Sequence, residues 1–138
     1  MSDDGLITIE SRHTVGDTLD RLTAGLAAKG VTVFARIDHA AGGALVDMPL
    51  RPTELLIFGA AKGGTPLMQS AQTIGIDLPL KALAWRDEAG QVWLTWNDIG
   101  WLARRHRLGA AADPAVEALG RLLAGLAQAA AGSASMAP

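Results

Sequence analysis

The chain has 138 residues, of which 49% are hydrophobic and 19% are charged, and its formal net charge is -2. This length fits one domain with a hydrophobic core, and the apolar content excludes an intrinsically disordered chain. The slightly acidic balance gives no overall electrostatic footprint for nucleic acid. The absence of cysteine excludes disulfides, thiolate metal sites and cysteine nucleophiles.

The same features bear on location. No apolar run approaches the roughly 20 residues of a membrane span. The first five residues are acidic and lack the basic start of a signal peptide. We therefore expect a cytoplasmic protein with no membrane or nucleic-acid partner.

The first third of the chain predicts a strand, a helix and a second strand. Residues 6–11 alternate and are rich in β-branched side chains. A capping box at Thr14–Asp17 opens an amphipathic helix that Lys29-Gly30 ends. Residues 31–38 form the second strand, with Thr32, Phe34, Arg36 and Asp38 on one face. Short joints predict a right-handed crossover and a parallel strand pair.

The middle of the chain predicts a second strand–helix–strand unit. A helical turn around residues 40–44 and an extended segment 45–48 precede a buried strand at residues 55–58. A loop, Lys62-Gly63-Gly64, then leads into a helix at residues 65–74. Thr65 suits its N-cap, Pro66 suits its first position, and Gly75 ends it.

The second half predicts a β-hairpin and two helices. Residues 81–86 and 91–96 are strands joined by a turn at residues 87–90. Asn97 or Asp98 caps a helix over residues 99–107, and Asp113-Pro114 opens the last helix. Gly120 and Gly125 in that helix predict close packing against the sheet or another subunit.

These elements predict an α+β fold, more specifically a two-layer α/β sandwich. We expect a mixed sheet of about five strands, covered on one face by helices. It contains two strand–helix–strand units and a hairpin in its C-terminal half. Residues 1–132 form a single domain, and the small residues 133–138 form a disordered tail.

Several short motifs together resemble the bacterial and archaeal family called domain of unknown function 302. The similarity runs from about Glu10 to Leu126, and the residues that carry it are Phe34–His39, Arg51–Leu55, Phe58-Gly59, Lys62, Gly64–Met68, Leu78–Lys81 and Trp93–Asn97. The resemblance implies a compact α/β domain that tends to form homodimers, with no established activity. The Asn-Pro pair that usually follows Phe-Gly in the family is Ala60-Ala61 here.

The glycine-rich segment at residues 59–65 is the first candidate site. It comes close to a P-loop, but the lysine precedes the second glycine instead of following it, which excludes nucleotide hydrolysis of that type. Lys62, Gly64 and Thr65, with Lys81 nearby in the family motifs, could still hold a carboxylate or phosphate at a helix start. The alternative is a tight turn in which Thr65 only caps its helix.

Arg36, Asp38 and His39 form a second candidate. A histidine beside a carboxylate can act as a general base, so Asp38 and His39 are the candidate catalytic pair and Arg36 a candidate ligand-binding residue. The alternative is a solvated strand edge with a surface ion pair. No serine lies in a G-x-S-x-G elbow, and the three histidines form no metal-binding pair. We therefore expect no metal and no cofactor.

Two further groups are interpreted structurally. The basic run at residues 104–107 fits a solvated helix end, where cations favour the dipole. Trp96 alternates with Val92 and Leu94 and should face the core with them, or the opposite side if the register is inverted, and Trp93 takes the other face of the same strand. Large aromatic side chains on both faces predict that a second subunit or a ligand covers the outer face.

Three hypotheses about function follow. The leading one is a homodimeric domain that binds a small ligand, with an anion favoured by the lysines, or acts in regulation without catalysis. The second is an enzyme that uses Asp38 and His39 as an acid–base pair. The third is a structural protein-interaction module, which predicts no pocket and a large apolar surface around Trp93.

Overall fold

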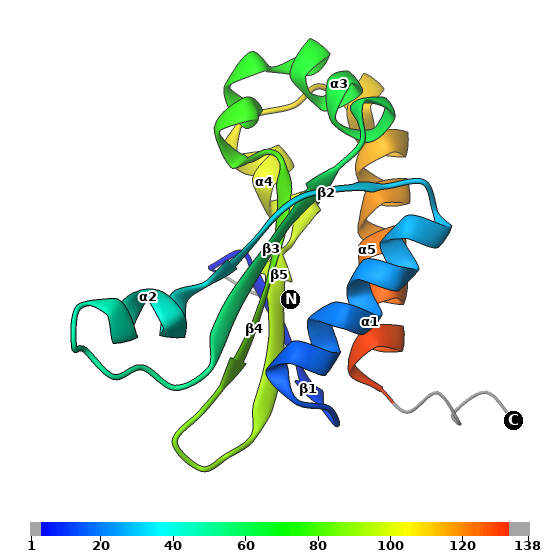
Figure 1. Ribbon diagram of the computed structural model, residues 1–138. Helices are drawn as coiled ribbons and strands as arrows, with labels where there is room; N and C mark the ends of the chain where they lie inside the picture. Colours follow the sequence, from blue (N-terminus) through cyan, green and yellow to red (C-terminus); the bar gives the residue numbers. More distant parts are fainter. Residues whose placement is uncertain (1–3, 133–138) are drawn as a thin grey trace, which may run out of the picture.

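The structure, a computed structural model, describes residues 4–132. It contains a five-stranded sheet with helices packed on one side (Figure 1). The predicted disordered tail at residues 133–138 lies outside the described residues. The strands are β1 (Leu6–Ser11), β2 (Thr32–Asp38), β3 (Thr53–Gly59), β4 (Leu80–Arg86) and β5 (Val92–Asn97). The helices are α1 (Val15–Ala28), α2 (His39–Leu45), α3 (Ala61–Ser70), α4 (Ile99–Arg105) and α5 (Asp113–Ala131), with 3₁₀ helices η1 (Gln72–Asp77) and η2 (Ala110–Ala112).

The two-layer α+β architecture is as predicted, but the strand pairing is not. The sheet order is β1-β5-β4-β3-β2, and every neighbouring pair is antiparallel. The predicted parallel pair of β1 and β2 is wrong, because these strands lie at opposite edges of the sheet. Three strands that come later in the chain lie between them, so the sheet is antiparallel rather than mixed. The second unit, β3–α3–β4, joins adjacent antiparallel strands.

The local signals that begin the helices are mostly confirmed. Thr14 accepts a hydrogen bond from the Asp17 amide at 3.1 Å and caps α1, and Gly30, with φ of +73°, follows its end. Asp98 caps α4, which ends at Arg105, two residues before the predicted end. The predicted extended segment at residues 45–48 is wrong, because α2 continues to Leu45 and a turn follows.

A β-bulge in β2 changes which side chains share a face. Val33 pairs with Phe58, whereas Ala35 pairs with Ile57, so Phe34 is the extra residue. Beyond the bulge, Arg36 pairs with Leu56 and lies on the same, helix-facing side as Val33. The predicted alternation, which placed Arg36 opposite Val33, is therefore wrong.

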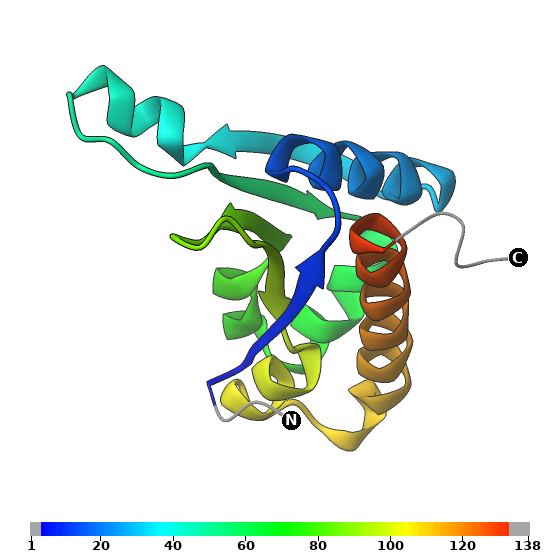
Figure 2. The same cartoon turned by 90° about the horizontal axis from the view of Figure 1, so that it is seen from below.

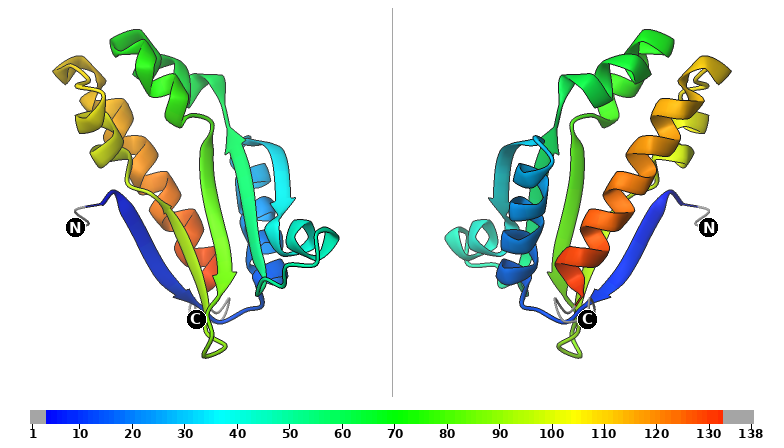
Figure 3. Two further views of the ribbon diagram at one scale, coloured as in Figure 1. Left: turned by 90° about the vertical axis from the view of Figure 1, so that its left-hand side faces the viewer. Right: turned by 90° about the vertical axis from the view of Figure 1, so that its right-hand side faces the viewer.

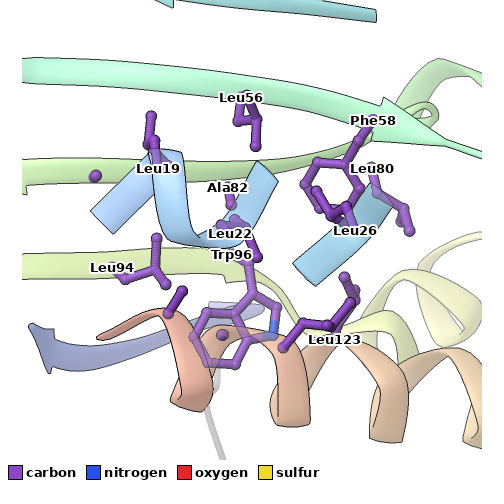
Figure 4. Close-up of a cluster of buried hydrophobic side chains, with 14 of the residues drawn as sticks. Leu19, Leu22, Leu26, Leu56, Phe58, Leu80, Ala82, Leu94, Trp96 and Leu123 are labelled. Carbon is purple, nitrogen blue, oxygen red and sulfur yellow. The ribbon is translucent and has the colours of Figure 1, made fainter. Parts of the chain in front are cut away.

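One hydrophobic core lies between the helices and the inner face of the sheet (Figure 4). Trp96 is 5% exposed and faces this core, which is the first of the two orientations that the alternation allows. Other fully buried side chains in the cluster come from α1, β3, α3 and β5: Leu19, Leu26, Leu56, Phe58, Leu67 and Leu94. Burial of such side chains contributes about 1.5–3 kcal/mol each to folding.

Helices α1 and α5 make the closest contact between the helices of the layer. A Cβ atom on Gly25 would lie 3.1 Å from a methyl carbon of Leu126, so a glycine permits this approach. Arg21 donates to the carbonyls of Ala129, Ala130 and Gly132 at the C-terminus of α5. Gly120 and Gly125 face open space in the single chain and do not pack against the sheet, so packing against another subunit is the part of that prediction that remains. Figures 2 and 3 show that the two helices diverge from this contact, so that the N-terminal end of α5 lies far from α1.

The segment between β2 and β3, here called the α2 arm (residues 39–52), projects away from the sheet (Figures 1 and 3). No residue of α2 is buried. Four large apolar side chains of the arm are exposed, by 50% to 87%: Leu45, Val46, Met48 and Leu50. The arm therefore exposes apolar surface that the described chain does not cover.

The β4–β5 hairpin is confirmed, and one carboxylate organises its turn. Asp87 accepts hydrogen bonds from the Trp93 indole at 2.9 Å and from the amides of Ala89 and Gln91. The indole hydrogen bond is the main reason that the pKa of Asp87 is lowered from its ordinary value of 3.8.

This network predicts a pH dependence of stability. A carboxylate whose pKa is lowered by folding stabilises the protein above its unfolded pKa of about 3.9 and loses that contribution as pH falls through the folded pKa. We expect Asp87→Asn to lower the free energy of unfolding at neutral pH and to bring the variant closer to wild type in acid. Urea denaturation of both proteins over a pH series tests this, and parallel curves would contradict it.

Candidate ligand-binding site

Helix α3 starts earlier than its sequence predicts. It runs from Ala61 with Ala60 as N-cap, so Lys62 and Gly64 lie in its first turns rather than in a loop. The amides of Gly63 and Gly64 both donate to the Ala60 carbonyl, at 2.9 and 3.1 Å. Thr65 is therefore inside the helix and does not cap it, and the predicted Thr65 N-cap is wrong. The predicted end at Gly75 is also wrong, since α3 ends at Ser70 and η1 follows.

Beneath α3 lies a cavity of about 590 Å³. Its walls come from the end of α1, the ends of β2 and β3, helix α3, the segment before β4 and the N-terminal half of α5. Its apolar side chains are Leu26, Val31, Phe34, Phe58, Met68, Leu78, Pro79, Leu80, Leu119, Leu122 and Leu123. Phe58, Leu26 and Leu80 at one end of the core are labelled in Figure 4. The cavity thus continues the hydrophobic core toward solvent.

Glycines keep this cavity open along α3. A Cβ atom on Gly63 would lie 3.5 Å from Leu119, and one on Gly64 would lie 3.5 Å from Leu78. Both leucines also line the cavity. Glycine lowers helix stability by about 1 kcal/mol relative to alanine, so α3 is less stable with these two glycines, and the cavity beside them is larger.

Three of the predicted ligand-binding residues line this cavity: Lys62, Gly64 and Thr65. Lys29, at the C-cap of α1, also lines the cavity and was not predicted. Among the described residues that line the cavity, Lys29 and Lys62 are the charged ones, and both are exposed. The site is therefore an apolar cavity with cationic groups at its rim.

The other two predicted ligand-binding residues are engaged elsewhere. Arg36 contacts Asp20 at 2.6 Å, Glu54 at 2.9 Å and the Gly16 carbonyl at 3.0 Å. Burial lowers the pKa of Arg36, but its hydrogen bonds to the two carboxylates outweigh this and raise the pKa above its ordinary value. Arg36 thus ties β2 to α1 and β3.

Lys81, the other predicted ligand-binding residue, also lies outside the cavity. Its ammonium donates to the carbonyls of Pro79, at 2.9 Å, and Asp77, at 3.3 Å. It pairs across the sheet with Ile57, on the face opposite the cavity, and it does not line the cavity. The predicted grouping of Lys81 with Lys62, Gly64 and Thr65 is therefore not one site.

The candidate catalytic pair lies at the base of the α2 arm. The Asp38 carboxylate accepts a hydrogen bond from the Ala41 amide at 2.8 Å and acts as the N-cap of α2. His39 is exposed and is the first residue of that helix. Neither residue lines the cavity. Capping of α2 gives Asp38 a structural role, and the catalytic role of the pair stays a hypothesis.

A hydrogen-bonded chain that sequence reasoning missed joins η1 to α4. His106 contacts Asp77 through Nε2 at 2.5 Å and Thr73 through Nδ1 at 2.9 Å. Arg105 adds contacts of 3.1 Å to both carboxylate oxygens. His106 and Asp77 are 29 positions apart, so no local motif indicates their pairing. In the described part of the chain, no three His, Cys, Asp or Glu residues are placed to hold a metal ion.

The hydrogen bonds of His106 to Thr73 and Asp77 hold the segment whose residues Gly75 and Leu78 line the cavity. The His106 side chain is 8% exposed and that of Asp77 is 18% exposed, so removing the imidazole leaves a partly buried carboxylate with poorer pairing. We expect His106→Ala to lower the free energy of unfolding by about 1–3 kcal/mol.

Chemical denaturation measures this effect, with His39→Ala as the matched control. His39 is exposed, so its replacement should change stability by less than about 0.5 kcal/mol. Equal effects of the two substitutions would show that the Asp77–His106 contact does not stabilise the fold.

Comparison with known proteins places the chain in a family. Residues 7–126 match the family described as domain of unknown function DUF302. The chain belongs to the DUF302 family. Its fold matches the crystal structure of an uncharacterized conserved DUF302 protein from Bacillus stearothermophilus, with a TM-score of 0.81 at 14% identity over 91% of this chain and 98% of that one. The expected α+β sandwich of this DUF302 protein is thus confirmed.

Two similar proteins from Brucella carry a functional name. Over 117 residues, or 85% of this chain, it is 52% identical to fluoride-specific ion channel FluC 1 of Brucella suis biovar 1 (strain 1330) and to FluC 2 of Brucella melitensis biotype 1 (strain ATCC 23456). The match covers 46% and 43% of those proteins, so the chain spans less than half of their length. No helix in the described part of this DUF302 chain combines the length and hydrophobicity that crossing a membrane requires.

Proposed function

We propose that this protein is a non-catalytic binding domain for a small molecule with a largely apolar body, held in the cavity beneath α3. The observation that carries the proposal is the cavity itself. Its volume of about 590 Å³ lies within the range of about 300–1,000 Å³ that is usual for ligand sites. Its walls are mostly aliphatic and aromatic, with few polar groups, which is also usual for such sites.

The glycines of α3 support the proposal. Gly63 and Gly64 lie next to cavity-lining leucines, where larger side chains would fill the space. A core without a ligand gains stability from filling an apolar space and from replacing glycine within a helix. Glycine at these two positions supports the proposal because a large side chain there would occupy the cavity.

The test is to fill the cavity. We expect Gly64→Leu to abolish binding of an apolar probe, decanol, while the folded state is retained, because leucine is a better helix former than glycine. Calorimetric titration of decanol into wild type and variant measures the loss.

Gly125→Leu is the matched control. It makes the same change in a helix, at a position that faces open space. Binding that survives in Gly64→Leu as well as in Gly125→Leu would exclude the cavity as the binding site.

A second proposal concerns self-association: the protein acts as a homodimer. The outer face of the sheet, opposite α1 and α5, supports it. Trp85 and Trp93 stack there with ring centroids 6.2 Å apart, and Thr95 accepts a hydrogen bond from the Trp85 indole. The outer face continues through the partly exposed side chains Leu83, Leu55 and Ile37. Together with the α2 arm, this is a large apolar surface for a monomer to expose.

We expect the double variant Leu45→Asp/Met48→Asp to be monomeric where the wild type is a dimer, because charges on the arm oppose its burial. Both side chains are exposed in the single chain, so the substitutions should leave the monomer folded. Sedimentation velocity measures the change.

Ile76→Asp is the control, because Ile76 is 77% exposed on η1, away from the arm. Loss of the dimer in this variant too, or a monomeric wild type, would count against the arm as an interface.

The Brucella relatives suggest a setting for such a domain. They are named fluoride-specific ion channels, and less than half of each lies within the match. In proteins of that kind, we propose that the domain serves regulation by binding its ligand. Fluoride is not the ligand that we propose, because a small, strongly hydrated anion loses its water in an apolar cavity at high cost. A cytoplasmic location, consistent with the lack of cysteine, belongs to the same proposal.

The enzyme hypothesis has less support. Its acid, Asp38, is engaged as a helix cap, and its base, His39, lies outside the cavity. Binding in the cavity needs neither residue.

A further inference from the structure

We infer that the ligand is an amphipathic monoanion, with an aliphatic body inside the cavity and a carboxylate at its rim beside Lys29 and Lys62. This inference rests on the binding function proposed above and names the chemical class of the ligand.

The charge at the rim has one sign. Lys29 comes from the end of α1 and Lys62 from the first turn of α3, so two separate elements bring cations to the same cavity. No aspartate or glutamate is among the described residues that line the cavity. Neither ammonium group has a salt bridge to a described residue, unlike the guanidinium of Arg36. The rim therefore attracts an anion and repels a cation.

The shape of a lysine side chain fits this arrangement. Its aliphatic stem can lie along an apolar wall while its ammonium stays in water. Both lysines are exposed, which places their charges where a head group would remain hydrated. A carboxylate there keeps most of its water and avoids the cost of entering the apolar interior.

The N-terminus of α3 carries the positive end of the helix dipole, the same sign of charge as the two lysines. Ala60, its N-cap, supplies no side-chain acceptor to the first-turn amides, and those residues line the cavity. The positive end of the helix dipole adds to the two lysines and does not carry the inference without them.

Other ligand classes fit less well. A nucleotide or other polyanion needs several donors to its phosphates, whereas the walls of this cavity are mainly apolar. A neutral apolar molecule would fill the cavity but leave the two lysines of its lining without a role. A single carboxylate on an aliphatic chain uses both parts of the site.

The experiment compares three probes that share one chain and differ in head group: decanoate, decanol and decyltrimethylammonium. Each is titrated by calorimetry into wild type and into Lys29→Gln/Lys62→Gln, below the micelle concentration. We expect decanoate to bind most tightly to the wild type, and the double variant to weaken decanoate roughly two- to fivefold per lysine, as for exposed charge pairs. Decanol should bind both proteins equally, and added salt should reduce the preference for decanoate.

Lys81→Gln is the matched control, because Lys81 lies outside the cavity and should leave decanoate binding unchanged. Amide resonances of Gly63 and Gly64 report binding in the cavity, and indole resonances of Trp85 and Trp93 report binding to the outer face.

The outcomes separate the two proposals. If decanol binds in the cavity but decanoate binds no better, or the lysine variant changes nothing, the inference about the anion is wrong and the binding function stands. If no probe shifts the Gly63 and Gly64 resonances, or the probes shift only the tryptophan resonances, both proposals are wrong.

Discussion

The close contact between α1 and α5 at Gly25 fixes the geometry of the whole helical layer. Leu126 packs directly against Gly25, and Arg21 holds the C-terminal carbonyls of α5 nearby. From this contact the two helices diverge toward the N-terminal end of α5. They therefore lie apart over the end of the sheet where β2 begins and β3 ends, and both contribute walls to the cavity there. A third helix, α3, closes over that end, and the space left beneath it is the cavity.

This arrangement gives the two surfaces of the sheet different roles. The inner face is a packed core that opens at one end into the cavity with its lysine rim. The outer face has no such layer from α1 and α5, and it presents the stacked Trp85 and Trp93 beside the exposed α2 arm. A ligand in the cavity would contact α3 and α5, whereas a second subunit would contact the opposite side. The proposed binding and dimerisation can therefore be tested separately by substitutions that do not overlap.

Local signals predicted local structure well. The capping residues Thr14 and Asp98 and the β4–β5 hairpin depend on residues only a few positions apart, and all are found. The strand order was mispredicted, because the crossover rule assumes adjacent strands and three later strands separate β1 from β2. Because of the bulge at Phe34, Val33 and Arg36 lie on the same face of β2 although the alternation predicted opposite faces. Lys62, Gly64 and Thr65, which are close in sequence, line one cavity, and their role in binding stays a prediction. Lys29 reaches the same cavity from a distant part of the chain, and the Thr73–His106 contact also joins distant segments, so neither could be read from a local motif.

The central claim is that the cavity beneath α3 holds a small molecule. Native mass spectrometry of the protein, purified gently from its expression host, tests this claim most directly because it requires no choice of ligand. We expect a species with the mass of one small organic acid per chain, which fragmentation would identify and which Gly64→Leu would lack. Wild-type protein that carries no added mass, and that also fails to retain decanoate supplied before purification, would contradict it.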